Sequence, residues 1–135
     1  NQNDVCVGTD EINRFEGLGG DDIVIGGSRD DFFNAGSGND SFDGGGPHDA
    51  DVIEYWYNGE AQLHGITLVQ DGDNSGTVID PWGDTDTFVN VETVIGTAFA
   101  DSFTGAWGND RFVGADGADS FDGGKCRVIA MYRSL

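Results

Sequence analysis

A nine-residue spacing of polar residues constrains this chain more than any other feature of its sequence. Each of these aspartate, asparagine or glutamate residues is followed two positions later by an apolar residue, and glycines fill much of the interval. Few folds produce so short a period, and it indicates stacked, repeated turns rather than one thick core. The polar positions are Asp4, Asn13, Asp22, Asp31 and Asp40 in a first stretch and Glu92, Asp101, Asp110 and Asp119 in a second.

The apolar positions of the repeat form a second register. A nine-residue unit divides into a turn of about six residues and a strand of about three, and the middle side chain of such a strand points inward. We therefore expect these side chains to stack as a narrow core, for which an apolar content of 37% suffices. The register comprises Cys6, Phe15, Val24, Phe33 and Phe42, and then Val94, Phe103, Phe112 and Phe121.

The two repeat stretches are copies of one unit. Residues 38–45 read GNDSFDGG and residues 117–124 read GADSFDGG, and the same offset relates Asp22 to Asp101 and Asp31 to Asp110. No stretch shows the 3.6-residue period of an amphipathic helix. The sequence predicts one all-β domain, residues 1–135, with a repeat block at 1–55, an irregular strand segment at 56–83, a second repeat block at 84–124 and a cap or tail at 125–135.

The period is interrupted in three places. The turn GGGPHDAD in the first block is two residues longer than the others, so Asp51 and Ile53 are expected to take over the polar and apolar roles. In the middle of the chain, residues 63–70 alternate as a strand, residues 71–76 read as a loop and residues 81–84 as a turn. The tail places Val128 where an aspartate is due.

The charge of the chain points to bound cations. It carries 25 acidic and 6 basic residues, a formal charge of −19. Two carboxylates ~4 Å apart repel by roughly 4 kcal/mol at an effective dielectric constant near 20. Nucleic acid is a poor partner because there is no basic patch, and no segment approaches the ~18 apolar residues of a membrane span.

The spacing also predicts how the ligands meet. Two nine-residue units make one coil, so an aspartate should meet the backbone carbonyls and the aspartate of the turn one coil away. Calcium accepts 6–8 oxygens at ~2.3–2.6 Å from mixed carboxylate and carbonyl sets, whereas zinc favours histidine and cysteine, which are scarce here. The expected pairs are Asp22 with Asp40, Asp101 with Asp119, Asp4 with Asp22, Asn13 with Asp31, and Glu92 with Asp110. The predicted calcium ligands are Asp4, Asn13, Gly19, Asp22, Gly27, Asp31, Gly36, Gly38, Asp40, Asp51, Glu92, Asp101, Gly108, Asp110, Gly117 and Asp119.

Four segments carry a family resemblance. GLGGDDIVI, GSGNDSFDG, AWGNDRFVG and ADGADSFDG resemble the GGxGxDxUx repeats of RTX (haemolysin-type) calcium-binding proteins, and DTFVNVETVIGTAFADSFTG is similar to the segment that restarts such repeats in large bacterial exoproteins. The resemblance implies a parallel β-roll, a β-solenoid of stacked nonapeptide turns with several calcium ions between the turns. It also implies type I secretion to the outside of a bacterium, within a larger secreted polypeptide that stays unfolded in the low-calcium cell.

The sequence departs from that pattern in places. Arg29 and Phe99 occupy a position where glycine is usual, and the turn that ends at Asn13 lacks the usual glycine, so weaker binding or none is expected there. The tail does not resemble an apolar secretion signal, and no signal peptide opens the chain. A fragment of a longer protein, or an unusual cap, is the expectation.

The aromatic residues and the paired acids suggest two other kinds of function. A carbohydrate-binding or adhesin module on the same scaffold is the alternative, since exposed aromatic side chains could stack on sugar rings; the candidates are Tyr55, Trp56, Tyr57, Trp82 and Trp107. An enzyme is not expected, because the repeat explains the paired acids and a narrow roll offers no cleft. Cys6 is expected to be a buried apolar residue, without a disulfide bond to Cys126.

Overall fold

The computed structural model consists of β-strands and turns. It describes residues 2–17, 19–46, 49–55, 62–107, 109–124 and 127–132, with the backbone alone at 109–110 and 127–132. The prediction of an all-β fold without helices is confirmed for these residues, which also contain no helix long and apolar enough to cross a membrane. The strands are β1 Val5–Val7, β2 Arg14–Glu16, β3 Ile23–Gly27, β4 Phe32–Asn34, β5 Ser41–Gly45, β6 Val52–Glu54, β7 Thr67–Gly72, β8 Ser75–Ile79, β9 Thr85–Val89, β10 Thr93–Ile95, β11 Ser102–Thr104, β12 Asn109–Ala115, β13 Ser120–Asp122 and β14 Arg127–Tyr132.

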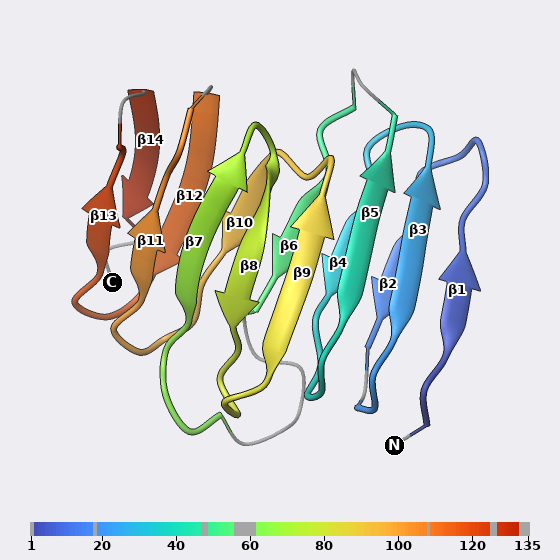
Figure 1. Ribbon diagram of the computed structural model, residues 1–135, viewed down its shortest axis with the longest axis horizontal. Coiled ribbons are helices and arrows are strands. Elements are labelled where there is room, and N and C mark those ends of the chain that lie inside the picture. Colours follow the sequence, from blue (N-terminus) through green and yellow to red (C-terminus); the bar gives the residue numbers. More distant parts are fainter. Residues whose placement is uncertain are drawn as a thin grey trace.

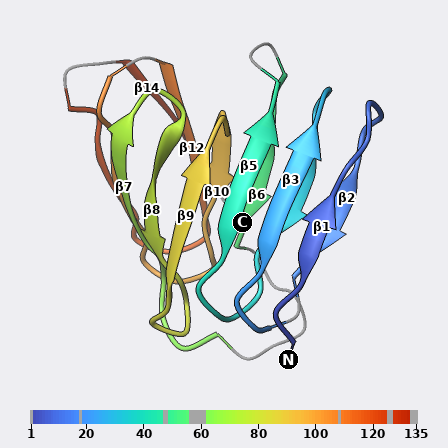
Figure 2. The same cartoon turned by 45° about the vertical axis from the view of Figure 1, so that its right-hand side comes forward.

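The strands form two facing sheets (Figures 1 and 2). Sheet A has the order β1-β3-β5-β9-β8-β7-β11-β13, and sheet B has the order β14-β12-β10-β6-β4-β2. Outside the β7–β9 region, consecutive strands alternate between the sheets and pair in parallel with the strand one coil away. Val5 pairs with Ile23 and Ile23 with Ser41, so one coil contains two nine-residue units, as the spacing predicts.

The middle of the chain widens sheet A alone. In sheet B, β6 pairs directly with β10, whereas in sheet A the strands β8 and β7 lie between β9 and β11. Strand β8 runs antiparallel to both of its neighbours. The two extra strands are therefore an insertion into one sheet, and the stack continues on both sides of it.

The predicted details of this middle segment are partly wrong. The strand begins at Thr67 rather than at residue 63, and Leu63 is 69% exposed. The expected loop at 71–76 is shorter, because β7 extends to Gly72 and β8 begins at Ser75. Asn74, with a positive φ of 54°, and a hydrogen bond of 2.8 Å from the Ser75 hydroxyl to Asp71 allow the tight reversal. The turn at 81–84 lies where it was predicted.

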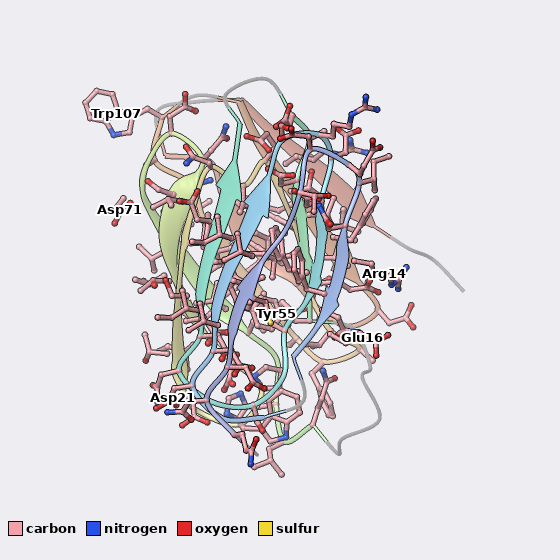
Figure 3. All side chains as sticks on the ribbon, turned by 90° about the vertical axis from the view of Figure 1, so that its right-hand side faces the viewer. Arg14, Glu16, Asp21, Tyr55, Asp71 and Trp107 are labelled. Carbon is pink, nitrogen blue, oxygen red and sulfur yellow. The ribbon has the colours of Figure 1, made fainter. Side chains whose placement is uncertain are left out.

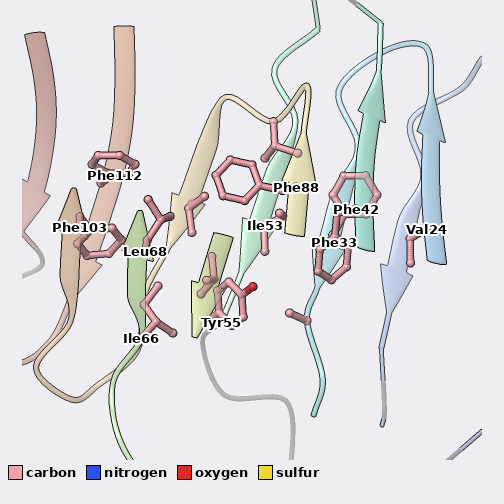
Figure 4. Packing of buried hydrophobic residues seen from close by; sticks show 14 residues of the cluster. Val24, Phe33, Phe42, Ile53, Tyr55, Ile66, Leu68, Phe88, Phe103 and Phe112 are labelled. Atoms are coloured by element: carbon pink, nitrogen blue, oxygen red, sulfur yellow. The ribbon is translucent and has the colours of Figure 1, made fainter. Parts of the chain in front are cut away.

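The core is a single layer of side chains between the sheets (Figure 4). The predicted phenylalanine ladder is two facing ladders, one from each sheet, because successive units alternate between sheets. Phe15 stacks on Phe33 in sheet B with ring centroids 5.4 Å apart, and Phe103 stacks on Phe121 in sheet A at 5.0 Å. Each such pair contributes about 0.5–1.5 kcal/mol beyond its buried area.

The tail adds a further strand to sheet B. Strand β14 pairs in parallel with β12, and Val128 lies opposite Asp110 in the register. The backbone of the tail therefore continues the stack although its sequence has lost the repeat.

Candidate metal centre

The turns line the two edges of the stack. We call those that lead into sheet A the A-turns; they end at Asp22, Asp40, Asp101 and Asp119. Those that lead into sheet B we call the B-turns; they end at Asn13, Asp31, Asp51, Glu92 and Asp110. Figure 1 shows the strands of sheet A, except the antiparallel β8, starting at one edge. Equivalent turns are thus stacked one coil apart, as a shared ligand would require.

A ladder of hydrogen bonds joins the acids of stacked turns. The backbone N–H of Asp22 donates to Asp40 Oδ1 at 2.8 Å, and that of Asp101 donates to Asp119 Oδ1 at 2.9 Å. The structure thus brings together four of the five expected pairs; the other two are Asp4 with Asp22 and Asn13 with Asp31.

The same ladder of hydrogen bonds continues through the longer turn and past the insertion. The N–H of Asp31 donates to Asp51 Oδ1 at 2.7 Å, and the N–H of Asp51 donates to Glu92 Oε2 at 2.9 Å. Ile53 takes the expected apolar position opposite Phe33. Asp51 therefore stands in the predicted register despite the two extra residues. Glu92 lies beside Asp51; the side chain of its expected partner Asp110 is outside the described residues.

The second oxygen of several ladder acids has no partner. Oδ2 of Asp31, Asp51 and Asp119 is buried and accepts no hydrogen bond from the described residues. Asp31 and Asp51 are fully buried. A buried, unpaired carboxylate oxygen costs several kcal/mol unless a proton, a cation or water compensates it.

A glycine faces each of these bare oxygens. A Cβ added to Gly26 would lie 2.3 Å from Asp31 Oδ2, one on Gly44 would lie 2.2 Å from Asp51 Oδ2, and one on Gly114 would lie 2.1 Å from Asp119 Oδ2. Only a residue without a side chain fits there. Each bare oxygen therefore lies close against the backbone of a glycine.

Burial sets the electrostatics of the same turns. Removal from water raises the pKa of Asp40 and of Asp51 to about 7 in each case, although backbone N–H groups from the neighbouring coil partly oppose the shift. Burial likewise raises the pKa of Glu92 and of Asp101. Ionising these carboxyl groups in the folded chain therefore costs free energy.

The comparison with protein families agrees with this geometry. The model of the RTX calcium-binding nonapeptide repeat matches residues 16–49 and 90–124, in four copies that cover just over half of the chain. The chain belongs to the RTX calcium-binding repeat family. RTX repeats bind calcium ions, several to an array. A search of curated proteins gave no match.

The bare oxygens fit that ion. Carboxylate and carbonyl oxygens are the ligands that calcium takes, and nitrogen and sulfur ligands are not needed. Among the described residues of this RTX chain, no group of three or more histidine, cysteine, aspartate or glutamate side chains could hold a metal by itself. Backbone carbonyls would therefore have to complete each site.

Several glycines of the RTX motif adopt the positive φ that a sharp turn requires. Gly27, Gly38 and Gly117 have φ of 119°, 125° and 111°, so they shape the turn. Gly19, with φ of 150°, and Gly36 also lie in A-turns, whereas Gly108 is outside the described residues. The glycines that face the bare oxygens were missed, although they precede the acid at a fixed distance in most repeats.

The departures from the motif have distinct structural consequences. Arg29 adopts the left-handed conformation, φ 77°, where other turns have glycine; this strains a non-glycine residue by about 1–2 kcal/mol. In the turn with Phe99, Thr97 donates its N–H to Asp101 Oδ2 at 2.8 Å and its hydroxyl to Asp101 Oδ1 at 2.9 Å. Both oxygens of Asp101 are thus occupied without an ion.

The side chain of Asn13 is also occupied by hydrogen bonds within the protein. Asn13 Nδ2 donates to Asp31 Oδ1 at 3.0 Å and to the carbonyl of Glu11. The amide therefore acts as a donor on its partner, which places it poorly as a calcium ligand.

Other polar residues of the ladder escaped the sequence prediction. Asp86 accepts the N–H of Asp40 at 2.9 Å and the hydroxyl of Tyr55 at 2.6 Å. Burial raises the pKa of Asp86 to about 8 and that of Tyr55 well above its usual value. The signal was present, because Asp86 precedes Phe88 by two residues, as in the repeat. Asp49 and Asp80 also have a buried Oδ2 that accepts no hydrogen bond from the described residues, and both lie outside the nine-residue register.

A second, exposed ladder runs through the residues that precede the ladder acids of the first block. Asp21 accepts the N–H of Asn39 at 3.0 Å, which lowers the pKa of Asp21, and Asn3 accepts the N–H of Asp21 at 2.9 Å. Neighbouring positions of the repeat thus have separate roles: one residue ties coils together at the surface and the next carries its carboxylate inward.

Proposed function

We propose that this chain is a calcium-dependent folding and support module, a β-roll, of a secreted bacterial protein. The buried Oδ2 atoms of Asp31, Asp51 and Asp119, which accept no hydrogen bond from the described residues, carry the proposal. They recur at both edges of the stack, each opposite a glycine, as expected if calcium occupies the turns.

The ions would be held by the acids of stacked turns together with backbone carbonyls. The best-supported positions are those with a bare oxygen, and the other predicted ligands extend them along both edges. Asp101 and Asn13 are the weakest members, because protein groups already engage their side chains. When bound, calcium supplies the positive charge that the buried carboxylates lack.

This arrangement explains how the ion can act as a compartment switch. Without calcium, a chain of charge −19 must bury carboxylates at its turns, and repulsion favours the open chain. Extracellular calcium modules bind at Kd values of about 10⁻⁴–10⁻³ M, which cytosolic calcium does not reach. The chain would therefore stay open in the cell and fold after secretion, with the rest of its larger polypeptide. We regard residues 1–135 as a single domain with the blocks predicted from the sequence.

The alternatives receive less support. The RTX repeat is a structural calcium-binding repeat. Of the aromatic residues considered for carbohydrate binding, Tyr55 is buried between the sheets, whereas Trp107 is 69% exposed and projects from a turn (Figure 3). Trp56 and Tyr57 lie outside the described residues. One exposed ring does not make a stacking platform, so we do not propose a sugar-binding function.

Far-UV circular dichroism of the chelated protein, titrated with calcium and separately with magnesium, tests the proposal. We expect a transition from coil to β-structure at sub-millimolar to millimolar calcium and none with magnesium, which demands a stricter octahedron. A spectrum already rich in β-structure and indifferent to calcium would contradict it.

A further inference from the structure

The outer face of sheet A collects most of the exposed apolar side chains. Its eight strands turn alternate residues away from the core. Twelve large hydrophobic side chains are exposed among the described residues, and seven of them lie on this face. Figure 1 shows sheet A in front of sheet B, with no other described strand over its outer face. The seven are Val5, Val7, Ile23, Ile25, Val69, Ile79 and Val89, between 37% and 69% exposed.

Most of the remaining positions on this face are small hydroxyl residues. One row crosses five neighbouring strands as Ser41, Thr87, Thr77, Val69 and Thr104, each opposite the next in the register. Threonine and valine have the same branched shape, so the row presents methyl groups and hydroxyls at nearly one height. β-Branched side chains on a pleated surface pack well against neighbours, and the inner faces of two packed sheets interdigitate such side chains. The face therefore has the form of a sheet that is ready to pack on another sheet.

The charge of this face differs from that of the chain as a whole. The eight strands of sheet A contain no lysine, arginine or glutamate. Its outward carboxylates, Asp43, Asp71 and Asp122, each accept a hydrogen bond from a group of the chain, at 2.8–3.0 Å. Two copies of a chain with a formal charge of −19 repel each other, and the repulsion is weakest where this face meets its own copy.

The same charges decide between kinds of partner. A basic protein would find more opposite charge at the acidic turn edges than on this face. An anionic membrane would be repelled by the acidic chain, which has no basic residue in sheet A to attract it. A partner for this face must be sheet-like, partly apolar and weakly charged. The outer face of sheet A in a second copy of the chain meets all three conditions.

The face is also large enough for a specific contact. Eight strands at a spacing of ~4.8 Å span about 34 Å, and each presents two or three outward residues. About twenty residues of each copy would be covered, which reaches the roughly 20–30 residues per side of a standard interface.

We propose that the folded chain forms a two-fold symmetric dimer in which the outer faces of two A sheets pack against each other. Such a contact is isologous and closes at two copies, and two aligned sheets pack about 10 Å apart. The two-fold axis would pass through the middle of the face, near Thr87 and its register partner Thr77. The contact uses none of the turns, so it goes beyond the proposed calcium function and requires only that the chain is folded.

Sedimentation equilibrium of the 135-residue chain in saturating calcium tests the dimer. We expect the mass to rise with concentration from 14.3 kDa towards twice that value. Ile79→Lys places a charge within the contact, so the Kd of the dimer should rise by about tenfold or more. Ile12→Lys is the matched control, because Ile12 is also exposed, 61% against 46% for Ile79, but lies in a B-turn. A parent chain that stays at 14.3 kDa, or an equal effect of the two variants, overturns the proposal.

A pair of variants with opposite charges tests which faces meet. Thr87→Lys and Thr87→Glu change an exposed side chain and keep the backbone N–H that donates to the Asp40 carbonyl. Far-UV circular dichroism first confirms that each variant folds. Each alone should then be monomeric, because like charges meet near the axis, whereas an equimolar mixture should dimerise. A mixture as monomeric as its two parts overturns the proposal, as do assemblies of more than two copies.

Failure of the dimer and failure of the proposed function give different results. Calcium-driven folding of a chain that stays monomeric would support the proposed function and reject the dimer. A chain that is folded and dimeric in chelator would support the dimer and reject calcium-dependent folding.

Discussion

Two sets of buried acids, three in repeat turns and three in or beside the inserted strands, are served by the protein in different ways. In the first set, Asp31, Asp51 and Asp119 each keep one oxygen that accepts no hydrogen bond from the described residues. Around the insertion, protein donors occupy both oxygens: Tyr55 and the N–H of Asp40 serve Asp86, and Thr97 serves Asp101. Glu92 is treated in the same way, by the N–H of Asp51 and the amide of Asn74.

This difference teaches that dependence on calcium need not be uniform along one stack. Where the protein supplies its own donors, we expect an ion to add little stability; where an oxygen is bare, we expect the turn to need one. The insertion also has a dense core, in which Tyr55, Ile66, Leu68, Val78 and Phe88 are buried. The middle of the chain is therefore expected to be the part that holds together best in chelator, with Asp80 as its exception.

Calcium removal should have the largest effect and should separate the two regions. We expect amide protons of β3, β4 and β5 to lose most of their protection in chelator, because their turns contain the bare oxygens. Amides of β7, β8 and β9 should exchange more slowly. Hydrogen exchange followed by mass spectrometry, with and without calcium, measures both.

Equal loss of amide protection in all strands would contradict the expected difference between the two regions. If all strands lose protection together, the stack is one cooperative unit and the donors of the middle segment do not act independently. If β7–β9 exchange first, the insertion is the weaker part.

The second largest effect is expected from Tyr55→Phe. The Tyr55 hydroxyl donates to Asp86 Oδ2 at 2.6 Å inside the core. Its removal leaves a buried carboxylate oxygen without its donor, so the free energy of unfolding should fall by about 2 kcal/mol, the scale of a hydrogen bond to a charged group. Urea denaturation at saturating calcium and at the lowest calcium concentration that still folds the chain measures this loss, which should appear at both. A loss confined to saturating calcium would assign Asp86 to an ion rather than to Tyr55.

A pair of isosteric variants sharpens the comparison further. In Asp101→Asn, an amide NH₂ replaces the Oδ2 that accepts the Thr97 N–H, so stability should fall by about 1–2 kcal/mol at every calcium concentration that folds the chain. In Asp119→Asn, the Oδ1 that accepts the N–H of Asp101 remains and only the bare oxygen is lost. We expect little change at the lowest calcium concentration that folds the chain and a smaller gain in stability as calcium is raised. Urea denaturation across a calcium series measures both variants, and identical behaviour of the two would show that bare and occupied carboxylates are equivalent.

Much of this architecture could be predicted from spacing alone. A nine-residue period fixes which residues stack and which face inward, because two units close one coil and a strand alternates its faces. The shift of register to Asp51 and Ile53 was predictable for the same reason. What the period cannot show is which sheet receives an insertion, so the placement of β7 and β8 within sheet A could not be derived.

The site was predictable in its residues but not in its atoms. The sequence indicates that Asp101 and Asp119 occupy equivalent positions. Thr97 nevertheless donates a hydrogen bond to Oδ2 of Asp101, whereas Oδ2 of Asp119 accepts none from the described residues. That difference depends on a hydroxyl and an N–H reaching a particular oxygen, which only coordinates reveal. Asp80 was invisible for another reason, since it lies outside any repeat and is buried by the inserted strand.

The smallest expected effect is a dependence on pH in chelator, and its sign follows from the raised pKa values. Asp40 and Asp51 have pKa values of about 7 in the folded chain against an ordinary value of 3.8. Between these values the folded chain binds protons that the unfolded chain does not, so the free energy of unfolding falls as the pH rises through this window. Asp21, whose pKa is lowered, acts only below it. By circular dichroism, the metal-free chain should therefore keep more β-structure at about pH 5 than at about pH 8, because protons partly replace the missing ions. Calcium should reverse this trend, since its ligands must be deprotonated. Metal-free stability that rises with pH would show that these carboxylates are already compensated without an ion, and would erase the distinction between the repeat turns and the middle of the chain.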